Sequence, residues 1–401
     1  VSNRILKDNP KLHFGAAVSG GSDSMFLIQY LHLFLSKKHS HLMDHLNYIP
    51  SLTAFVVDHK IRSESTKEAN TVKKILNESG INCNILSLHW SHDDEHTKSK
   101  QAILRNKRYN ILLEESRKLG IHYLFTGHNW NDQMETFLMR MSKGSSIQGL
   151  IGMNYSVSFT YDIELLRPLL HFPKEKIVET CKENNWLWVE DPSNQDTKYT
   201  RNYVRKLITS NSNELLNQKE LQTIYENSLL LKNDLDNQIT ELLHNSFCFM
   251  WKYGAFILNL KELDRCDNSV VKLYTIRKAL RYICRNPQKL SIKLCEELLE
   301  YLHSPSPKIF SIGGCLVYPC SKQYSKQYGI SFIVVHSTED VDAIPIVPDK
   351  VTIFDNRWLI TCSNKIIQDN TSKYTVEYLK PNSSYFKKKK NLYNQLKTII
   401  G

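Results

Sequence analysis

The chain contains 401 residues, of which 52 are Lys or Arg and 41 are Asp or Glu, so its formal net charge is +11 at neutral pH. This length predicts two or three domains rather than a single core, and the basic excess favours a polyanionic partner such as nucleic acid over a solvated basic surface. The nine cysteines include no CxxC pair, which argues against a disulfide framework or a structural zinc site, and no apolar run is long enough for a membrane span or a signal-peptide core, so we expect a cytoplasmic protein without a membrane partner.

The first predicted elements enclose a glycine-rich turn. A short apolar strand ending at Val18 leads into Ser19-Gly20-Gly21-Ser22-Asp23-Ser24, and apolar residues at helical spacing follow from Met25. The two glycines permit a sharp turn, the serines add donors, and the start of a helix carries a partial positive charge. No lysine follows the glycines in the frame of a Walker A motif. The stretch predicts a phosphate-binding loop, and an ordinary strand-to-helix turn is the alternative.

Strands and helices alternate through the rest of the first half. Apolar runs at 52–59, 81–88 and 121–127 predict three strands, and a short fifth strand precedes Arg167. Ser65-Thr66-Lys67-Glu68 resembles a capping box that begins a helix, and further helices are expected over 100–119 and 173–184. This order predicts a doubly wound, parallel, five-stranded α/β sheet, with ligands at the carboxyl ends of its strands. We therefore expect residues 15–24 and 126–132 to meet.

A second candidate site follows the fourth strand. His128, Asp132 and Glu135 are spaced four and three residues apart, which places helical members of the set on one face of a helix that we expect to end at Met141. A capped, solvated helix start is the alternative for this set.

The second half of the chain is expected to be helical and then strand-rich. Helical patterns cover 218–244, 269–284 and 291–303, with a strand-like segment at 247–260, and a basic run, Phe386-Lys387-Lys388-Lys389-Lys390, lies near the end. We expect a catalytic domain at 1–208, a mostly helical substrate domain at 214–303 and a small, basic, α+β or β-rich domain at 308–401.

Five motifs in order resemble those of the tRNA(Ile)-lysidine synthetases, a family of PP-loop ATP pyrophosphatases with an adenine nucleotide hydrolase-like fold. They are Ser19–Ser24; Val57-Asp58-His59 with Arg62 and Glu68-Ala69; Gln101-Ala102 with Arg105 and Arg108-Tyr109; His128 with Asp132-Gln133 and Glu135-Thr136; and Glu190-Asp191-Pro192-Ser193-Asn194 with Arg201-Asn202. The resemblance covers roughly residues 14–205. Asn129-Trp130-Asn131 departs from the family pattern, which more often has smaller or charged residues there.

The resemblance implies an ATP-dependent ligase that joins free L-lysine to the wobble cytidine of the isoleucine tRNA with a CAU anticodon. ATP would adenylate the base and release pyrophosphate, and the ε-amine of lysine would then displace AMP. The resemblance also implies which residues bind the cofactors. Mg²⁺ would be held by Asp23 or Asp132, and ATP would be bound by Ser19, Gly20, Gly21, Ser22, Asp23 and Ser24.

The same resemblance suggests roles for the remaining site residues. Arg108 would bind the α-phosphate or the activated base, and His128 would orient either one. Asp132 or Glu135 would hold the lysine amine and accept its proton. Asp58 and His59 either line the adenosine pocket or simply end their strand.

Three other interpretations stay open at this stage. A PP-loop tRNA thiolase would typically carry CxxC pairs, and an amidotransferase-linked synthetase would need a glutaminase module, neither of which the sequence shows. A basic RNA-binding module with a dead nucleotide loop is the third. The sequence does not reveal the oligomeric state and leaves a homodimer open.

Overall fold

The computed structural model describes residues 12–36, 48–60, 64–88, 100–160, 162–189, 218–250, 255–284, 290–305, 307–321, 325–326, 329–336, 344–345, 351–354, 358–361 and 375–376. Contacts divide the chain into two compact units, Val1–Leu230 and Leu231–Gly401, and the boundary falls inside the long helix α11 (Gln218–Ser246).

The first unit is built on a mixed six-stranded sheet. In sheet order its strands are β3 (Asn82–Ser87), β2 (Ser51–Asp58), β1 (His13–Val18), β4 (Tyr123–Thr126), β6 (Glu164–Leu166) and β5 (Ser156–Ser158). The first five are parallel, and β5 pairs with β6 in the antiparallel direction at the edge. The predicted five-stranded parallel sheet is thus confirmed, and β5, a short Ser-Val-Ser segment, adds a sixth strand.

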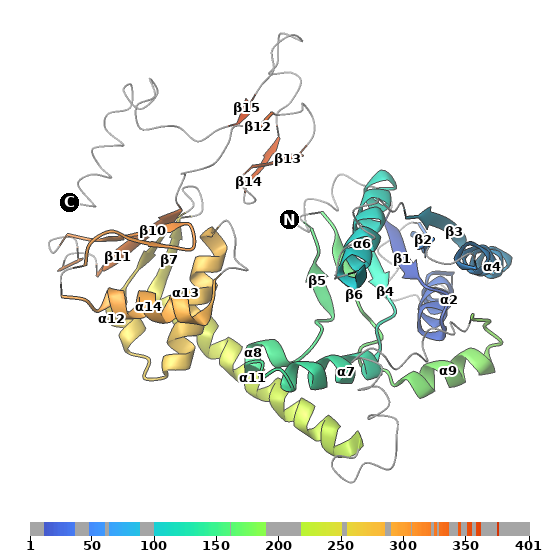
Figure 1. Cartoon of the computed structure of the whole chain (residues 1–401), viewed down its shortest axis with the longest axis horizontal. Helices are drawn as coiled ribbons and strands as arrows, with labels where there is room; N and C mark the ends of the chain where they lie inside the picture. Colours follow the sequence, from blue (N-terminus) through green and yellow to red (C-terminus); the bar gives the residue numbers. More distant parts are fainter. Residues whose placement is uncertain are drawn as a thin grey trace. The chain divides into compact units, whose positions relative to one another are not determined.

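Helices cover both faces of this sheet. Successive residues of a strand point to opposite faces, so neighbouring residues of one strand pack against different helices. Ala54 and Val56 of β2 pack with residues of α2 (Ser22–Ser36) and α4 (Ser65–Glu78), including Val72. Phe55, between them in sequence, packs instead with Leu112 of α6 (Lys100–Lys118). This arrangement is doubly wound, as the alternation of elements predicts (Figure 1).

The start of α4 corrects one prediction. Its N-cap residue is Glu64 without a side-chain cap hydrogen bond, so the capping box expected at Ser65-Thr66-Lys67-Glu68 is wrong. The hydroxyls of Ser65 and Thr66 donate instead to the two carboxylate oxygens of Asp58 at 2.8 and 2.7 Å, and the backbone N–H of Lys60 donates to Asp58 at 3.0 Å. Burial alone would raise the pKa of Asp58, but these hydrogen bonds outweigh it and lower the pKa below its usual value. Asp58 therefore fastens α4 to the end of β2.

Three further helices border the carboxyl edge of the sheet. α9 (Lys174–Glu183) packs Ile177 and Cys181 against the apolar face of α2. α7 (Trp130–Met141) contacts α8 (Ile147–Leu150), and its Met134 and Phe137 pack with Tyr225 near the start of α11. The expected helices 100–119, 173–184 and the one ending at Met141 are confirmed.

The second unit contains a five-stranded antiparallel sheet with helices packed against it. In sheet order its strands are β7 (Phe247–Met250), β8 (Ala255–Leu258), β11 (Phe332–His336), β10 (Cys315–Pro319) and β9 (Phe310–Ile312). The helices are α12 (Leu260–Asp264), α13 (Ser269–Ile283) and α14 (Ile292–Leu302). Two short strand pairs join β12 (Ile344–Pro345) to β15 (Thr375–Val376) and β13 (Val351–Phe354) to β14 (Trp358–Thr361). The helical patterns and the strand-like segment expected in this half are confirmed.

The division of the chain differs from the expected one. β8 pairs with β11, so residues before and after the expected boundary at 303–308 share one sheet and one apolar core. Helix α11 likewise begins in one unit and ends in the other, where its Ile239 joins that core. The contacts therefore give two compact units where the sequence pattern suggested three domains.

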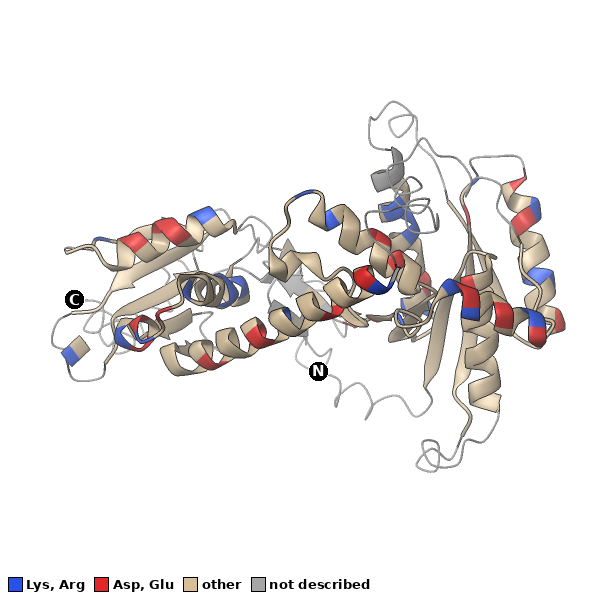
Figure 2. Cartoon of the chain, turned by 90° about the horizontal axis from the view of Figure 1, so that it is seen from below, with Lys and Arg blue, Asp and Glu red and all other residues tan. Residues whose placement is uncertain are grey.

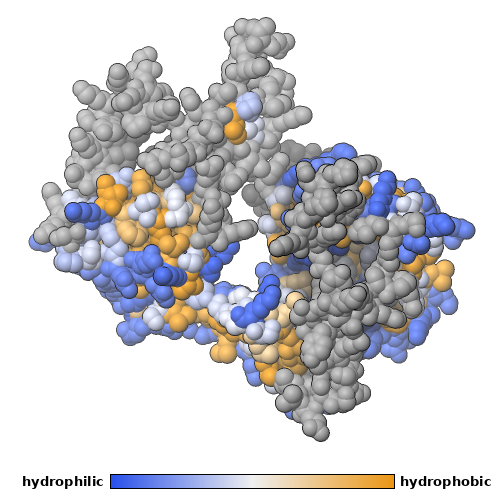
Figure 3. All heavy atoms as spheres, viewed as in Figure 1, coloured by the Kyte–Doolittle hydropathy of each residue, from blue (hydrophilic) through white to orange (hydrophobic). Residues whose placement is uncertain are grey.

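Among the residues coloured in Figure 3, the visible face carries hydrophilic surface with apolar patches between. Lys and Arg lie among Asp and Glu on most helices, but α13 carries Lys272, Arg277, Lys278 and Arg281 and no acidic residue (Figure 2). Within the described part of the chain, no helix has both the length and the apolar character that crossing a membrane requires.

Candidate active site

The topology of the sheet places a cavity beside β1. The chain passes from β1 to β2 and β3 on one side and returns as β4 on the other, so the loops after β1 and β4 diverge at the carboxyl edge. Such a switch point is where open α/β sheets bind ligands. A cavity of about 430 Å³ lies here and is bordered by residues of β1, β2, β4, the glycine-rich loop, α2, α6 and the start of α7.

The glycine-rich loop is braced from within. Gly20 has a φ of +91°, and a Cβ on it would lie 2.6 Å from Cγ2 of Val72, so this position accepts glycine alone without strain. The Ser24 hydroxyl donates to the Gly21 carbonyl at 2.9 Å and accepts from the Ser19 N–H at 3.1 Å. A Cβ on Gly21 would meet only Ser19 Oγ, at 3.8 Å. Gly20 thus shapes the loop, whereas Gly21 leaves its side of the loop open to the cavity.

Gly127 brings the two loops into direct contact. A Cβ at this position would lie 3.0 Å from the backbone of Asp23 and Ser24. The chain after β4 can therefore approach the first turn of α2 this closely because residue 127 has no side chain. The expected meeting of residues 15–24 with 126–132 is confirmed.

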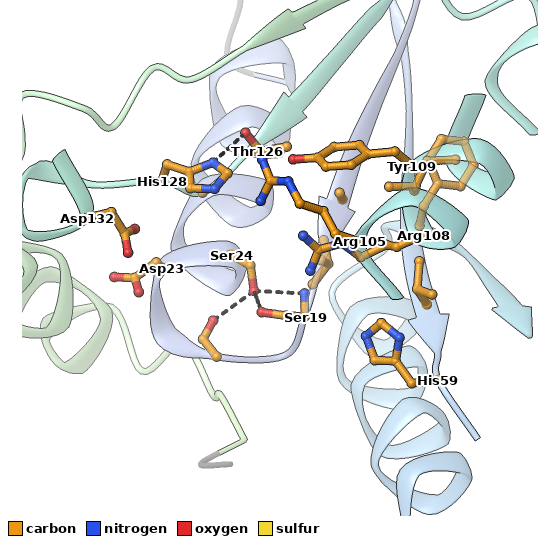
Figure 4. Close-up of a pocket in the computed structure, with 17 residues that line it drawn as sticks. Ser19, Asp23, Ser24, His59, Arg105, Arg108, Tyr109, Thr126, His128 and Asp132 are labelled. Carbon is orange, nitrogen blue, oxygen red and sulfur yellow. Dashed lines mark hydrogen bonds between the residues drawn. The ribbon is translucent and has the colours of Figure 1, made fainter. Parts of the chain in front are cut away.

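Two carboxylates lie on this side of the cavity, connected through Asn129. The Asn129 side chain donates to Asp23 Oδ1 at 2.9 Å and accepts from the Asp132 N–H at 3.0 Å, while its own N–H donates to Asp132 Oδ2 at 3.1 Å. Asp132 is therefore part of a capping box at the start of α7 and also borders the cavity. Figure 4 shows the Asp23 and Asp132 side chains next to each other.

Cationic and aromatic side chains from α6 lie on the other side. The guanidinium carbons of Arg105 and Arg108 are 5.1 and 5.4 Å from the centre of the Tyr109 ring, and all three residues border the cavity. His128 lies near the carboxylates, with Nδ1 3.0 Å from the Thr126 hydroxyl (Figure 4). The cavity therefore offers backbone and hydroxyl donors between a basic side and an acidic side, as a nucleotide with a phosphate chain and a second, cationic reactant would need.

Comparison with known proteins indicates the family of the chain. Residues 2–212 match the PP-loop domain family. The Schizosaccharomyces pombe protein named "Probable tRNA(Ile)-lysidine synthase" is 31% identical over 374 residues, which are 88% of this chain and 78% of that protein. The tRNA(Ile)-lysidine synthase of Orientia tsutsugamushi is 26% identical over 383 residues, which are 94% of this chain and 80% of that protein. The chain belongs to the tRNA(Ile)-lysidine synthase family. Among solved structures, the U34-tRNA thiolase NcsA from Methanococcus maripaludis with its [4Fe-4S] cluster is 18% identical, at a TM-score of 0.45, and covers 56% of this chain and 73% of its own.

The structure brings most of the predicted site residues to the cavity of this family member. The predicted residues that border it are Ser19, Gly21, Asp23, Ser24, Arg108, His128 and Asp132. Gly20 and Ser22 belong to the loop but do not border the cavity, and Glu135 is 0% exposed within α7 and does not border it either. His59 lines the cavity while the Asp58 carboxylate is occupied at the start of α4. The roles of these residues stay predictions.

Several residues at the cavity have no individual role predicted from the sequence. Arg105 and Tyr109 are named only as members of a motif, and the position of Arg105 one helical turn before Arg108 also indicates a place at the site. Thr126 is named only within the range 126–132 that is expected to meet the loop. Asn129, beside the cavity, departs from the family pattern, but it caps α7 and binds Asp23. The motifs at 190–194 and 201–202 lie outside the described residues.

The donor set fits magnesium. No group of three or more His, Cys, Asp or Glu side chains suited to a metal occurs among the described residues. Mg²⁺ is usually bound by one or two carboxylates together with substrate phosphates, and Asp23 and Asp132 beside the loop supply that number.

Proposed function

We propose that this chain joins free L-lysine to the wobble cytidine of the isoleucine tRNA bearing a CAU anticodon, at the expense of ATP. The observation that supports it most directly is one cavity that combines a PP-loop, a pair of arginines and a pair of carboxylates. Membership of the tRNA(Ile)-lysidine synthase family supports the isoleucine tRNA as the substrate, and free lysine as the second reactant is part of this proposal. On this proposal the chain is a carbon–nitrogen ligase.

The first half-reaction activates the base. The exocyclic oxygen of the cytidine attacks the α-phosphorus of ATP, the bond to the β-phosphate breaks, and pyrophosphate leaves. The backbone N–H groups at the start of α2 and the Ser19 hydroxyl hold the phosphates, Ser24 keeps the loop in shape through its bond to the Gly21 carbonyl, and Arg108 stabilises charge on the α-phosphate or the base. Mg²⁺, held by Asp23 and Asp132, would neutralise phosphate charge as the bond breaks.

The second half-reaction transfers lysine. The ε-amine attacks the activated ring carbon, the carbon–oxygen bond breaks, and AMP leaves with that oxygen. An ammonium with an ordinary pKa of about 10.4 is almost wholly protonated at neutral pH, so it must lose a proton before it can attack. Asp132, which borders the cavity, is placed to bind the ammonium and accept that proton. Glu135, one turn further along α7, is buried and does not border the cavity, so on this proposal it would act on the amine through its neighbours in α7 and not by direct contact.

The tRNA body is expected to bind basic surfaces outside the cavity. Helix α13 carries four basic residues and no acid, and Arg281 and Tyr282 near its end are exposed. Lysines and arginines contact phosphates without reading sequence, which suits the tRNA backbone. We also propose that the basic domain at residues 308–401 binds tRNA; its basic run, Lys387–Lys390, lies outside the described residues.

The thiolase alternative needs a thiolate, and the described chemistry near the loop does not favour one. Cys181 lies against the start of α2, with Sγ 3.9 Å from the Ser22 carbonyl. Burial and the nearby Asp23 charge raise the pKa of Cys181 to about 11, so its thiol is protonated at neutral pH.

The test is pyrophosphate release by the purified chain with ATP, magnesium and a transcript of the isoleucine tRNA. We expect release with the cytidine-34 transcript, including when lysine is omitted, and none with a transcript that carries uridine at that position. Release that is indifferent to the wobble base would contradict the proposal, and absence of release from either transcript would favour a non-catalytic RNA-binding role.

A further inference from the structure

The phosphate loop of this chain contains no basic residue. Ser19–Ser24 offers N–H groups, hydroxyls and one carboxylate, and the two arginines that border the cavity come from α6 on its other side. Phosphate-binding loops commonly pair their N–H donors with a cation, as the lysine of a Walker A loop does. A phosphate chain over this loop would also face the negative charge of Asp23, which makes a nearby cation more necessary.

A lysine from a distant part of the sequence contacts Asp23 of this loop, although it does not itself border the cavity. Lys174, the first residue of α9, has its Nζ 3.2 Å from Asp23 Oδ2. The other oxygen of Asp23 accepts from Asn129, so the carboxylate is shared between α7 and α9. The Lys174 N–H donates to the Asn131 side chain at 3.0 Å, which fixes the start of α9 beside the start of α7.

The backbone of Lys174 is held in place by helix packing, whereas its ammonium group can change its ion-pair partner. Ile177 and Cys181 anchor α9 on the apolar face of α2, the helix that begins in the phosphate loop. The Lys174 and Asp23 side chains are 45% and 21% exposed. An ion pair with this much exposure contributes little to stability, so the ammonium can leave Asp23 when a more highly charged partner arrives.

We propose that Lys174 is the phosphate-binding cation of this site, holding the β- and γ-phosphates of ATP and then the departing pyrophosphate. The inference rests on the proposed function and deepens it. With no ligand bound, Lys174 neutralises Asp23. When a phosphate chain occupies the loop, its ammonium turns from Asp23 to the phosphate oxygens, and Asp23 is released to bind a divalent cation.

The test measures binding of inorganic pyrophosphate and of AMP by isothermal titration calorimetry in EDTA, without metal or tRNA. We expect Lys174→Gln to weaken pyrophosphate binding about tenfold or more, because it removes a charged hydrogen bond, and to leave AMP binding unchanged. Lys176→Gln, an exposed neighbour on the same helix, is the matched control and should change neither. Lys174→Arg should retain most of the pyrophosphate affinity.

A second variant separates phosphate binding from a structural role. Asp23→Asn frees Lys174 and removes a repulsive charge, so in EDTA it should bind pyrophosphate more tightly than the wild type. That gain should largely disappear in Asp23→Asn/Lys174→Gln. Equal weakening of AMP and pyrophosphate in folded Lys174→Gln would assign Lys174 to helix packing and overturn the inference, as would unchanged pyrophosphate binding. A wild-type chain that binds neither ATP nor pyrophosphate would overturn the proposed function, and this inference with it.

Discussion

Gly20→Ala should destabilise the first unit through two separable effects. The residue has a φ of +91°, a conformation that costs an L-residue about 1–2 kcal/mol. The new Cβ would also lie 2.6 Å from Cγ2 of Val72, well inside the usual contact distance, and such overpacking costs about 1–3 kcal/mol. Together these give a loss of about 2–5 kcal/mol in the free energy of unfolding. For a unit of this size each kcal/mol lowers the melting temperature by roughly 2–4 °C.

A double-mutant cycle with Val72→Ala separates the two effects. Val72→Ala alone removes two buried methyl groups and should cost about 1.5 kcal/mol or more. In that background Gly20→Ala should cost only its backbone part, about 1–2 kcal/mol, because the clashing methyl is absent. The cycle is measured by urea unfolding followed by tryptophan fluorescence, to which Trp130, Trp186 and Trp188 of the first unit contribute. An equal cost of Gly20→Ala in both backgrounds would refute the steric argument, and no cost in either would refute the backbone argument.

Six further substitutions test the site and its supports. Gly21→Val should leave folding intact, because a Cβ there meets only Ser19 Oγ at 3.8 Å, yet it should abolish tRNA-dependent pyrophosphate release. Asp23→Ala should have the same effect. Normal turnover of either folded variant would move the phosphate site elsewhere. Glu135→Gln should still release pyrophosphate but transfer labelled lysine poorly, whereas Asp132→Asn and Arg108→Ala should lose both steps; equal loss of both steps in Glu135→Gln would place that residue with the nucleotide. Asp58→Asn should cost about 1–3 kcal/mol at neutral pH. Because the pKa of Asp58 is lowered on folding, its contribution to stability is fully present above the unfolded pKa of about 3.9 and is lost as the pH falls through the folded value. In acid titrations below about pH 4, the stability of Asp58→Asn should therefore fall less than that of the wild type. Parallel curves for the two proteins would contradict this.

The fold was largely predictable because its strands carry their signal locally. The run Leu52–Asp58 is almost entirely apolar and β-branched, as a strand buried on both faces must be, and the order of such runs fixes a doubly wound sheet. β5 has only three residues, two of them serines, and is held by its pairing with β6, so it gives no comparable pattern.

The hydrogen-bond and ion-pair partners of individual side chains were not predictable in this way. Ser65 and Thr66 have the local pattern of a helix cap, but the carboxylate of Asp58 takes both hydroxyls. The capping-box geometry formed instead at Asn129 and Asp132, where the carboxylate also borders the cavity. Lys174 stands 151 residues from its partner Asp23, and nothing in the sequence near either one indicates the pair.

Helical spacing alone also cannot rank Asp132 and Glu135. The two are three residues apart, which favours a shared face, yet Asp132 borders the cavity and Glu135 is fully buried. The difference arises because neighbours of Glu135 on α7 pack against α11, a helix that begins more than 80 residues later. Burial of this kind depends on tertiary packing, which the periodicity does not contain.

Mass spectrometry of the isoleucine tRNA, after incubation with the purified chain, ATP, magnesium and lysine, measures the proposed ligation itself. We expect the wobble nucleotide to gain the mass of lysine less one water. The gain should require both ATP and lysine and should be absent from a transcript with uridine at position 34. Replacement of oxygen by sulfur in the presence of a sulfur donor, or an unchanged tRNA mass under conditions where the chain is folded and binds ATP, would contradict the proposed ligation.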